Sequence, residues 1–260
     1  MSVTETLLRP LLAAGGARPL ITFYDDAAGH RIELSSATVA NWAAKTANWL
    51  RDELDVEPGM PVAVRLPAHW QTLGVLLGAW WCGAEVRAET AGAEVAIIPA
   101  AEVAGTRDAT ATATAPAEVV AALGARTVAV VGLDALGAPV RLPADAGVGL
   151  VDYTSEIRVY GDDFTVWEPV GGDAPALAGA DVDTVLASAR ARAAELGIGA
   201  TDRVLSTLDW TVPEGVAAHL LPVLVSGASL VQCHQADPAK LAGRREAERV
   251  TRVLGKESAG

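Results

Sequence analysis

Strand-like and helix-like segments alternate near both ends of this 260-residue chain, and this alternation restricts the fold more than any other feature of the sequence. A β-hairpin is predicted at residues 20–26 and 30–35, where strand-forming residues flank an Ala-Ala-Gly turn. After it we expect a helix, a strand at 61–68, a buried helix at about 70–82 and a strand at 83–89. Such alternation is typical of α/β folds built on a parallel sheet.

The last third of the chain resumes the same alternation. Its clearest element is an amphipathic helix at 181–197, with Asp181 as the N-cap and Gly197 at its C-terminal end. The other elements predicted here are strands at 153–160, 162–170, 202–208 and 228–233, a helix at 212–227 and a charged helix in the C-terminal tail.

The middle of the chain has weaker patterns. A strand is predicted at 94–100 and a short helix at 118–125, with an Ala/Thr-rich loop at 105–117 between them. The stretch 137–150 contains Pro and Gly and is the best candidate for a linker. We therefore predict two α/β subdomains with mostly parallel sheets covered by helices, residues 1–150 and residues 151–260, the second with the charged helical tail.

The net charge and the cysteines exclude several classes of function. A formal charge of −12 argues against binding to nucleic acids or to anionic membranes. The longest apolar run, at 72–84, is too short to span a bilayer, and the N-terminus does not have the pattern of a signal peptide. Cys82 and Cys233 stand far apart and fit no metal-binding motif. We therefore expect a cytoplasmic protein without a metal site.

Two blocks of sequence resemble the adenylate-forming enzymes, the superfamily of acyl-CoA synthetases, luciferases and nonribosomal-peptide adenylation domains. The first block contains "VEPGMPVAVRLP" and "WCGAEV", and the second contains "TDRVLSTL" and "LVSGASLVQC". The chain is most similar to a short class from high-GC Gram-positive (actinobacterial) bacteria that keeps part of the large N-terminal domain. The resemblance implies a partial adenylate-forming N-terminal domain without a C-terminal lid domain.

Adenylation needs a Gly-rich loop whose backbone N–H groups hold the phosphates of ATP, together with cations that spread the developing charge. The resemblance places this loop about a dozen residues before the 181–197 helix, at "EPVGGDAPALAG" (168–179). The Tyr-Thr-Ser at 153–155 only imitates the start of the family's loop, because its spacing to the helix is wrong.

The loop at 168–179 has lost most of its phosphate-binding groups. Gly171 and Gly172 remain, but the family's threonines, serine and lysine are absent, and Glu168 and Asp173 add negative charge. No lysine stands between Lys45 and Lys240 in the chain, so no shift of the alignment recovers one. We predict that Gly171 and Gly172 are the vestige of the phosphate loop. The alternative is that they form a plain turn.

The resemblance also implies a carboxylate pocket after the second block. In "TLDWTVPEG" Trp210 stands where the family has an aromatic–histidine pair, without a histidine beside it. Asp209, Trp210 and Glu214 are predicted to line this pocket; the alternative is a packed indole with two solvated acids. The phrase "GKES" around Lys256 resembles a lysine motif near the family's C-terminus, but a coincidence explains it better.

These losses predict a degenerate, non-catalytic relative of the AMP-binding enzymes, a pseudoenzyme that acts as a binding or interaction module. The alternative is a truncated acyl-CoA ligase-like enzyme that binds ATP, AMP or an acyl-adenylate and needs a partner chain. The resemblance makes ATP or AMP the cofactor to test, although the residues themselves support none. Because a truncated sheet leaves edges that need cover, we also expect a homodimer or a protein partner.

Overall fold

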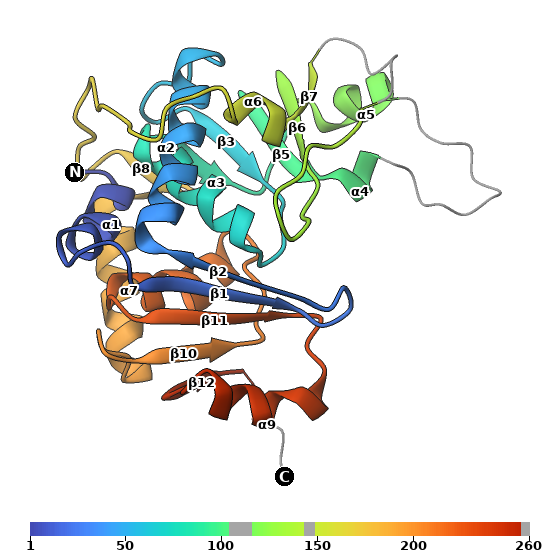
Figure 1. Ribbon diagram of the computed structural model, residues 1–260. Helices are drawn as coiled ribbons and strands as arrows, with labels where there is room; N and C mark the ends of the chain where they lie inside the picture. Colours follow the sequence, from blue (N-terminus) through green and yellow to red (C-terminus); the bar gives the residue numbers. More distant parts are fainter. Residues whose placement is uncertain (104–115, 143–148, 256–260) are drawn as a thin grey trace.

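The computed structural model describes residues 1–103, 116–142 and 149–255 and contains two β-sheets with helices between and around them (Figure 1). The five-stranded sheet contains, in spatial order, β12 (Arg252–Leu254), β10 (Arg203–Ser206), β11 (Ser229–His234), β1 (Pro19–Asp25) and β2 (His30–Ser35). The seven-stranded sheet contains β7 (Leu150–Asp152), β6 (Thr127–Val131), β5 (Val95–Pro99), β3 (Pro61–Val64), β4 (Glu85–Arg87), β8 (Pro175–Leu177) and β9 (Ala180–Asp181).

Most strand pairs are parallel, as the alternation of strands and helices predicted. Among the described strands, β2 pairs antiparallel with β1 and β9 antiparallel with β8, and the other pairings are parallel. The helices of the described residues are α1 (Val3–Ala13), α2 (Ser36–Asp52), α3 (Trp70–Trp81), α4 (Ala100–Val103), α5 (Pro116–Leu123), α6 (Tyr153–Ile157), α7 (Val182–Leu196), a π-helical turn (Val216–Leu220), α8 (Leu221–Val225) and α9 (Pro238–Ala247).

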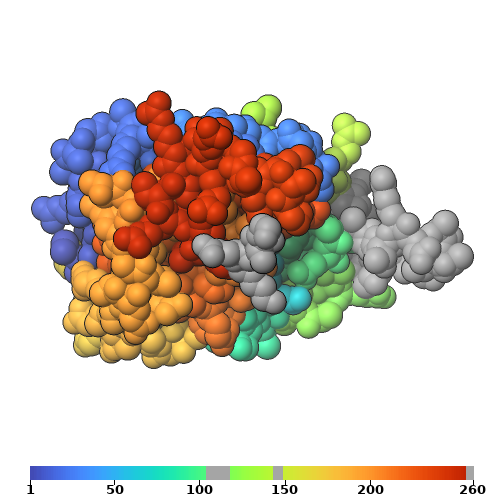
Figure 2. All heavy atoms as spheres, turned by 90° about the horizontal axis from the view of Figure 1, so that it is seen from below, coloured from blue at the N-terminus to red at the C-terminus, as the bar shows by residue number. Residues whose placement is uncertain are grey.

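One continuous apolar core joins the two sheets through the helices that lie between them. It contains Phe23 of β1, Val62 of β3, Leu50 of α2 and Leu73 of α3, all almost fully buried. The outer faces of the sheets have smaller cores of their own. One lies on the seven-stranded sheet around Ile98, and the other lies between the five-stranded sheet and the segment after β11. Figure 2 shows this C-terminal segment, in red, across the middle of the face seen from below.

Local sequence signals explain the elements that were predicted well. The Ser35 hydroxyl accepts a hydrogen bond from the Thr38 N–H at the start of α2, at 3.1 Å. At the start of α7 the Asp181 Oδ1 accepts a hydrogen bond from the Thr184 N–H at 2.7 Å. Gly197 ends α7 in the left-handed region, with φ of 62°. These are the N-cap and C-cap interactions that such residues favour. The hairpin, α3 and most of the parallel strands also lie where the patterns indicated.

The division of the chain at residue 150 does not match the division between the sheets. The hairpin β1–β2 joins the C-terminal strands, with Ile21 of β1 in register with Leu230 of β11. Conversely, β7 and β8 from the second half of the chain join the sheet of the N-terminal strands. Leu150 of β7 pairs with Val128 of β6, and Leu177 of β8 pairs with Val86 of β4. Each sheet therefore combines both halves of the chain, because strand partners are chosen by non-local pairing and packing rather than by position in the sequence.

The segment 153–160 is helical at its start, where the sequence predicted a strand. Asp152 caps α6, since its Oδ2 accepts a hydrogen bond from the Ser155 N–H at 2.9 Å. The Tyr153 hydroxyl lies 2.7 Å from that of Thr46 in the core. The β-branched and aromatic residues that suggested a strand are buried here as one face of a short helix, so tertiary packing overrides local propensity. The Asp N-cap was the signal against a strand.

The segment 162–170 lies outside both sheets, so the strand predicted there is wrong. Three side chains spaced by three along α2 take up the carbonyls of residues 160–165. Lys45 Nζ donates to the Tyr160 oxygen at 2.6 Å, Asn48 Nδ2 to that of Asp163 at 2.9 Å, and Arg51 Nη1 to that of Thr165 at 2.7 Å. One face of α2 thus binds several carbonyls that a neighbouring strand would otherwise pair with.

The C-terminal tail contains a strand as well as the predicted charged helix. After α9 the chain returns as β12, parallel to β10, with Leu205 in register with Val253. The predicted Ala/Thr-rich loop lies almost wholly outside the described residues, as do Lys256 and part of the predicted linker. Within the described ranges, no helix combines the length and the apolar character that a membrane crossing requires.

Candidate functional site

The predicted phosphate-loop segment, residues 168–179, leads into the short hairpin β8–β9 before α7. Gly171 is exposed and Gly172 half-buried. The Asp183 backbone N–H donates to the Gly172 carbonyl at 2.9 Å. A Cβ atom on Gly172 would lie 2.3 Å from the Asp183 Oδ2, and one on Gly171 would lie 2.4 Å from the Asp173 Oδ1. The space beside both glycines is therefore occupied by the chain's own carboxylates.

The second predicted set, Asp209, Trp210 and Glu214, lies in the loop after β10. Asp209 and Glu214 are exposed, whereas Trp210 is fully buried. The Asp209 Oδ1 accepts hydrogen bonds from the Ala68 N–H at 2.6 Å and from the Trp210 N–H at 2.8 Å. Asp209 thereby connects the carboxyl end of β10 with the loop after β3. The role of this set as a ligand pocket stays a prediction.

His219 belongs to the same region, and the sequence reasoning missed it. It lies in the π-helical turn, and its Nδ1 is 2.9 Å from the Asp209 carbonyl oxygen. No histidine is adjacent to Trp210 in the sequence, but the fold places His219 beside the same loop. No local pattern could have indicated this, because the contact depends on how the loop packs against the helix that follows.

The two predicted sets lie next to opposite ends of α3. The loop containing Gly171 follows Val170, which packs on Gly83, just after α3 ends. Asp209 binds Ala68, just before α3 begins. The twelve residues of α3 separate these points by about 18 Å, at a rise of 1.5 Å per residue. Whether one ligand contacts both sets stays a prediction.

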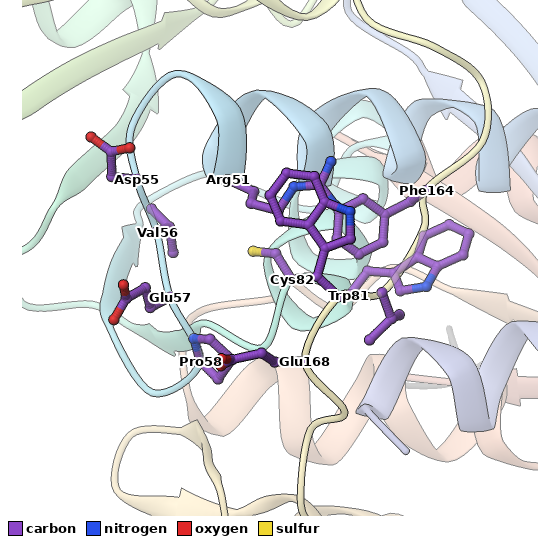
Figure 3. A pocket seen from close by; sticks show the side chains of 11 residues that line it. Arg51, Asp55, Val56, Glu57, Pro58, Trp81, Cys82, Phe164 and Glu168 are labelled. Atoms are coloured by element: carbon purple, nitrogen blue, oxygen red, sulfur yellow. The ribbon is translucent and has the colours of Figure 1, made fainter.

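A cavity of about 380 Å³ opens beside the residues that precede β3 and β4, at the amino-terminal ends of these strands (Figure 3). It lies among the C-terminal ends of α2 and α3 and the segment that leads into the predicted phosphate loop, including the first residue of that loop, Glu168. None of the residues predicted as a site lines it. Its lining residues are Arg51, Asp55, Val56, Glu57, Pro58, Trp81, Cys82, Phe164, Val166, Trp167 and Glu168.

Aromatic rings and one arginine pack together in the cavity wall. The Arg51 guanidinium carbon lies 3.8 Å from the centre of the Trp167 ring and 4.6 Å from that of Phe164. The Phe164 ring in turn packs on Trp81, with 5.7 Å between ring centres. Trp167 remains 71% exposed. The sequence could not have marked these residues, because nothing local indicates that a loop tryptophan will stand over a helical arginine.

Two further buried groups are unsuited to nucleophilic or acid–base chemistry near neutral pH. Burial raises the pKa of the Cys82 thiol to about 12, so the thiolate is not formed. Burial, and then the neighbouring His234, lower the pKa of His69 to about 3, so its imidazole stays neutral.

Comparisons with known proteins agree with the fold. The chain superposes on an acyl-CoA synthetase of Brucella canis with a TM-score of 0.73 and 16% identity, over 97% of this chain and 47% of the other. It also superposes on the N-terminal domain of FACL13 from Mycobacterium tuberculosis, with a TM-score of 0.64 and 17% identity, over 96% and 61% of the two chains. The predicted fold, an adenylate-forming enzyme N-terminal domain, is confirmed. The chain spans about half the length of the synthetase.

Sequence comparison identifies a much nearer relative. No family model matches the chain. A curated protein of Mycobacterium tuberculosis (strain ATCC 25618 / H37Rv), named "TIGR03089 family protein", is 45% identical over 254 residues, which cover 97% of this chain and 98% of that protein. The predicted resemblance to a short actinobacterial class is confirmed by this match. With this identity along nearly its whole length, and with the fold of an adenylate-forming N-terminal domain, the chain belongs to the TIGR03089 family.

Proposed function

We propose that this protein is a binding module that uses the fold of adenylate-forming enzymes without forming adenylates. The observation that carries the proposal is the position of the Asp183 carboxylate, directly beside Gly172 in the segment where the phosphate loop is expected. Together with Asp173 it places negative charge where the phosphates of ATP would have to lie. Like charges at this distance oppose phosphate binding unless a cation lies between them.

The lysines of the chain support the same conclusion. Lys45 is committed elsewhere, because its Nζ donates to the Tyr160 carbonyl and pairs with Asp162 at 2.9 Å. Lys240 lies on α9, with its Nζ 3.5 Å from Asp26 on the far side of the five-stranded sheet from the core. Neither lies in the 168–179 segment. The group that spreads negative charge during adenylation therefore has no counterpart among the described residues of this loop.

A binding role needs a place for a ligand, and the cavity beside Arg51 and Trp167 provides one. Its volume of about 380 Å³ lies within the usual range for small-molecule sites, roughly 300–1,000 Å³. A cytoplasmic location and a homodimer or protein partner remain part of the proposal. Exposed apolar side chains at Leu136, Val159 and Trp167 would be available to such a partner.

The direct test is ATP–pyrophosphate exchange with a panel of carboxylic acids, assayed beside an active acyl-CoA synthetase. We expect no exchange above the background without protein. Isothermal titration with Mg²⁺-ATP should likewise give no binding heat at millimolar nucleotide. Exchange with any acid of the panel would overturn the proposal.

The second candidate function is a truncated ligase that binds ATP or an acyl-adenylate and obtains its missing groups from a partner chain. The observation in its favour is the match of nearly the whole chain to about half of a synthetase. A ligand that binds the native state raises the melting temperature. Thermal-shift titration with ATP, AMP and CoA separates the two functions, because only the ligase predicts a shift.

A further inference from the structure

The cavity has an excess of negative charge at its rim. Three carboxylates, those of Asp55, Glu57 and Glu168, stand against one arginine. All three acidic residues are exposed. Asp55 has one distant ion pair, with Arg126 at 4.0 Å; for Glu57 and Glu168 the described residues provide none. The rim therefore offers carboxylates whose charge remains available to a ligand.

The arginine of the cavity is already used inside the protein. The Arg51 Nε donates to the Asp52 Oδ1 at 2.7 Å, Nη1 to the Thr165 carbonyl at 2.7 Å, and Nη2 to the Asn48 Oδ1 at 3.0 Å. Its guanidinium carbon also lies over the Trp167 ring. Because its donors and its face are both engaged, Arg51 holds the wall together and is a poor receptor for an anionic ligand.

Trp167 gives the cavity a second property that a cation would use. Its indole is 71% exposed although it is held in place by Arg51, so part of its surface is open to solvent. Tryptophan is the strongest of the aromatic partners for cations, and organic cations also bury apolar surface against the ring. The net charge of −12 on the whole chain further raises the local concentration of cations.

From the carboxylates, the engaged arginine and the exposed indole together, we propose that this cavity binds a small organic cation, an amine or quaternary ammonium ion with a short apolar body. The cation would lie against Trp167, with Glu57 and Glu168 balancing its charge. The proposal rests on the proposed binding function and names the ligand class for it. Its location, at the opposite end of α3 from Asp209, separates it from the carboxyl edge where α/β folds usually bind their ligands.

Three probes of nearly equal shape and different charge test the proposal: choline, the neutral 3,3-dimethyl-1-butanol and the anionic 3,3-dimethylbutanoate. Binding is followed through the indole N–H signals in ¹H–¹⁵N spectra, with the Trp167 signal assigned from its loss in Trp167→Phe. We expect choline to shift this signal saturably, with an affinity at least tenfold higher than that of the alcohol. The carboxylate should cause no shift. Equal binding of all three probes, or tighter binding of the carboxylate, would overturn the proposal.

Variants decide whether the named groups hold the cation, with choline binding to them measured by isothermal titration. Trp167→Ala should abolish binding, whereas Trp167→Phe should retain it in weaker form. The double change Glu57→Gln and Glu168→Gln should lower the affinity for choline at least fivefold. Glu246→Gln removes the same kind of charge from an exposed position on α9 and should leave affinity unchanged. Equal weakening by Glu246→Gln would reveal a general charge effect and overturn the site.

The two proposals fail separately. Absence of choline binding, together with absence of pyrophosphate exchange, would refute the cation site and leave the non-adenylating function standing. Pyrophosphate exchange would refute that function whatever the choline result. Competition by an arginine-rich peptide would identify a basic protein segment, rather than a free small molecule, as the source of the cation.

Discussion

The guanidinium carbon of Arg51 lies over the indole of Trp167, 3.8 Å from the ring centre, and so joins the last turn of α2 to a loop far along the chain. The loop itself makes no sheet pairing. Its position therefore depends on this stack and on the donors of α2 that take up its carbonyls. The same contact shapes the wall of the cavity, so Arg51 belongs both to the contacts that hold the loop and to the proposed binding site.

Replacing Arg51 with alanine should destabilise the protein by about 1–2 kcal/mol, since a partly buried cation–π contact and several hydrogen bonds are lost. Arg51→Lys should recover little of this, because an ammonium cannot stack or donate in a planar fork. Urea denaturation measures both. Arg192→Ala is the matched control: it removes an exposed ion pair with Glu195 and should cost less than about 0.5 kcal/mol. Full recovery by lysine would contradict the stacking argument.

Glu248 should make the stability of the protein depend on pH in the acid range. Burial alone would raise the pKa of Glu248, but hydrogen bonds from Tyr24, Arg203 and Arg31 outweigh it and lower the pKa to about 2. Because the folded-state pKa lies below that of the unfolded chain, the stabilisation is complete above about pH 4.5 and is lost as the pH falls towards 2.

Glu248→Gln should therefore cost about 2–3 kcal/mol at pH 7 and much less at pH 2. Denaturation curves across this range measure the difference between the variant and the native chain. Glu246→Gln, at an exposed position two residues earlier, should change neither stability nor its pH dependence. A constant difference between Glu248→Gln and the native chain from pH 7 to pH 2 would disprove the assignment.

Two glycines inside helices should respond to alanine in opposite directions. A Cβ on Gly78 of α3 would lie 2.4 Å from the Thr46 Cβ and 2.9 Å from the Ala43 oxygen on α2. Gly78→Ala should therefore cost roughly 1–3 kcal/mol by overpacking the α2–α3 contact. Gly243 of α9 has open space around its Cβ position, so Gly243→Ala should gain roughly 0.5–1 kcal/mol from helix propensity. Thermal unfolding measures the change in stability of each variant. Equal changes for Gly78→Ala and Gly243→Ala would contradict the close contact between α2 and α3.

His69 should remain neutral at pH 5, because burial lowers its pKa to about 3. Its Nδ1 accepts a hydrogen bond from the Gln71 N–H at 3.1 Å, so the proton should reside on Nε2. Since the unfolded chain takes up this proton first, His69 reduces stability as the pH falls from about 6.5 towards 3. Long-range ¹H–¹⁵N spectra, with His69→Gln for assignment, report the tautomer. A titration midpoint above pH 5 would refute the burial argument.

The sequence predicted elements whose signals act within a few residues. The caps of α7, at Asp181 and Gly197, and the turn of the β1–β2 hairpin are of this kind, and all three are confirmed. The predictions failed where the local propensity of a segment and its tertiary packing favour different structures. Residues 153–157 have strand-forming side chains, but the Asp152 cap and burial against Thr46 and Trp49 favour a helix.

The candidate site shows the same contrast. The missing lysine, serine and threonines of the 168–179 segment were evident from the residues themselves. The cavity was not, because Arg51, Trp81 and Trp167 lie far apart in the sequence and meet through packing between helix ends and a loop. The same holds for His219 beside Asp209.

For this protein, the sequence by itself determined several helices, among them α2, α3 and α7, most strands and the fold class. These elements depend on residue type and on periodicity over short distances, and the loss of phosphate-binding groups follows from the residues at 168–179 once the family resemblance has placed the loop there. Only the tertiary structure decided that β1 and β2 join the C-terminal strands, that Asp183 lies against Gly172, and that a cavity forms beside Trp167. These features depend on hydrogen bonds and packing between distant segments, whose partners become defined only when the whole chain is folded.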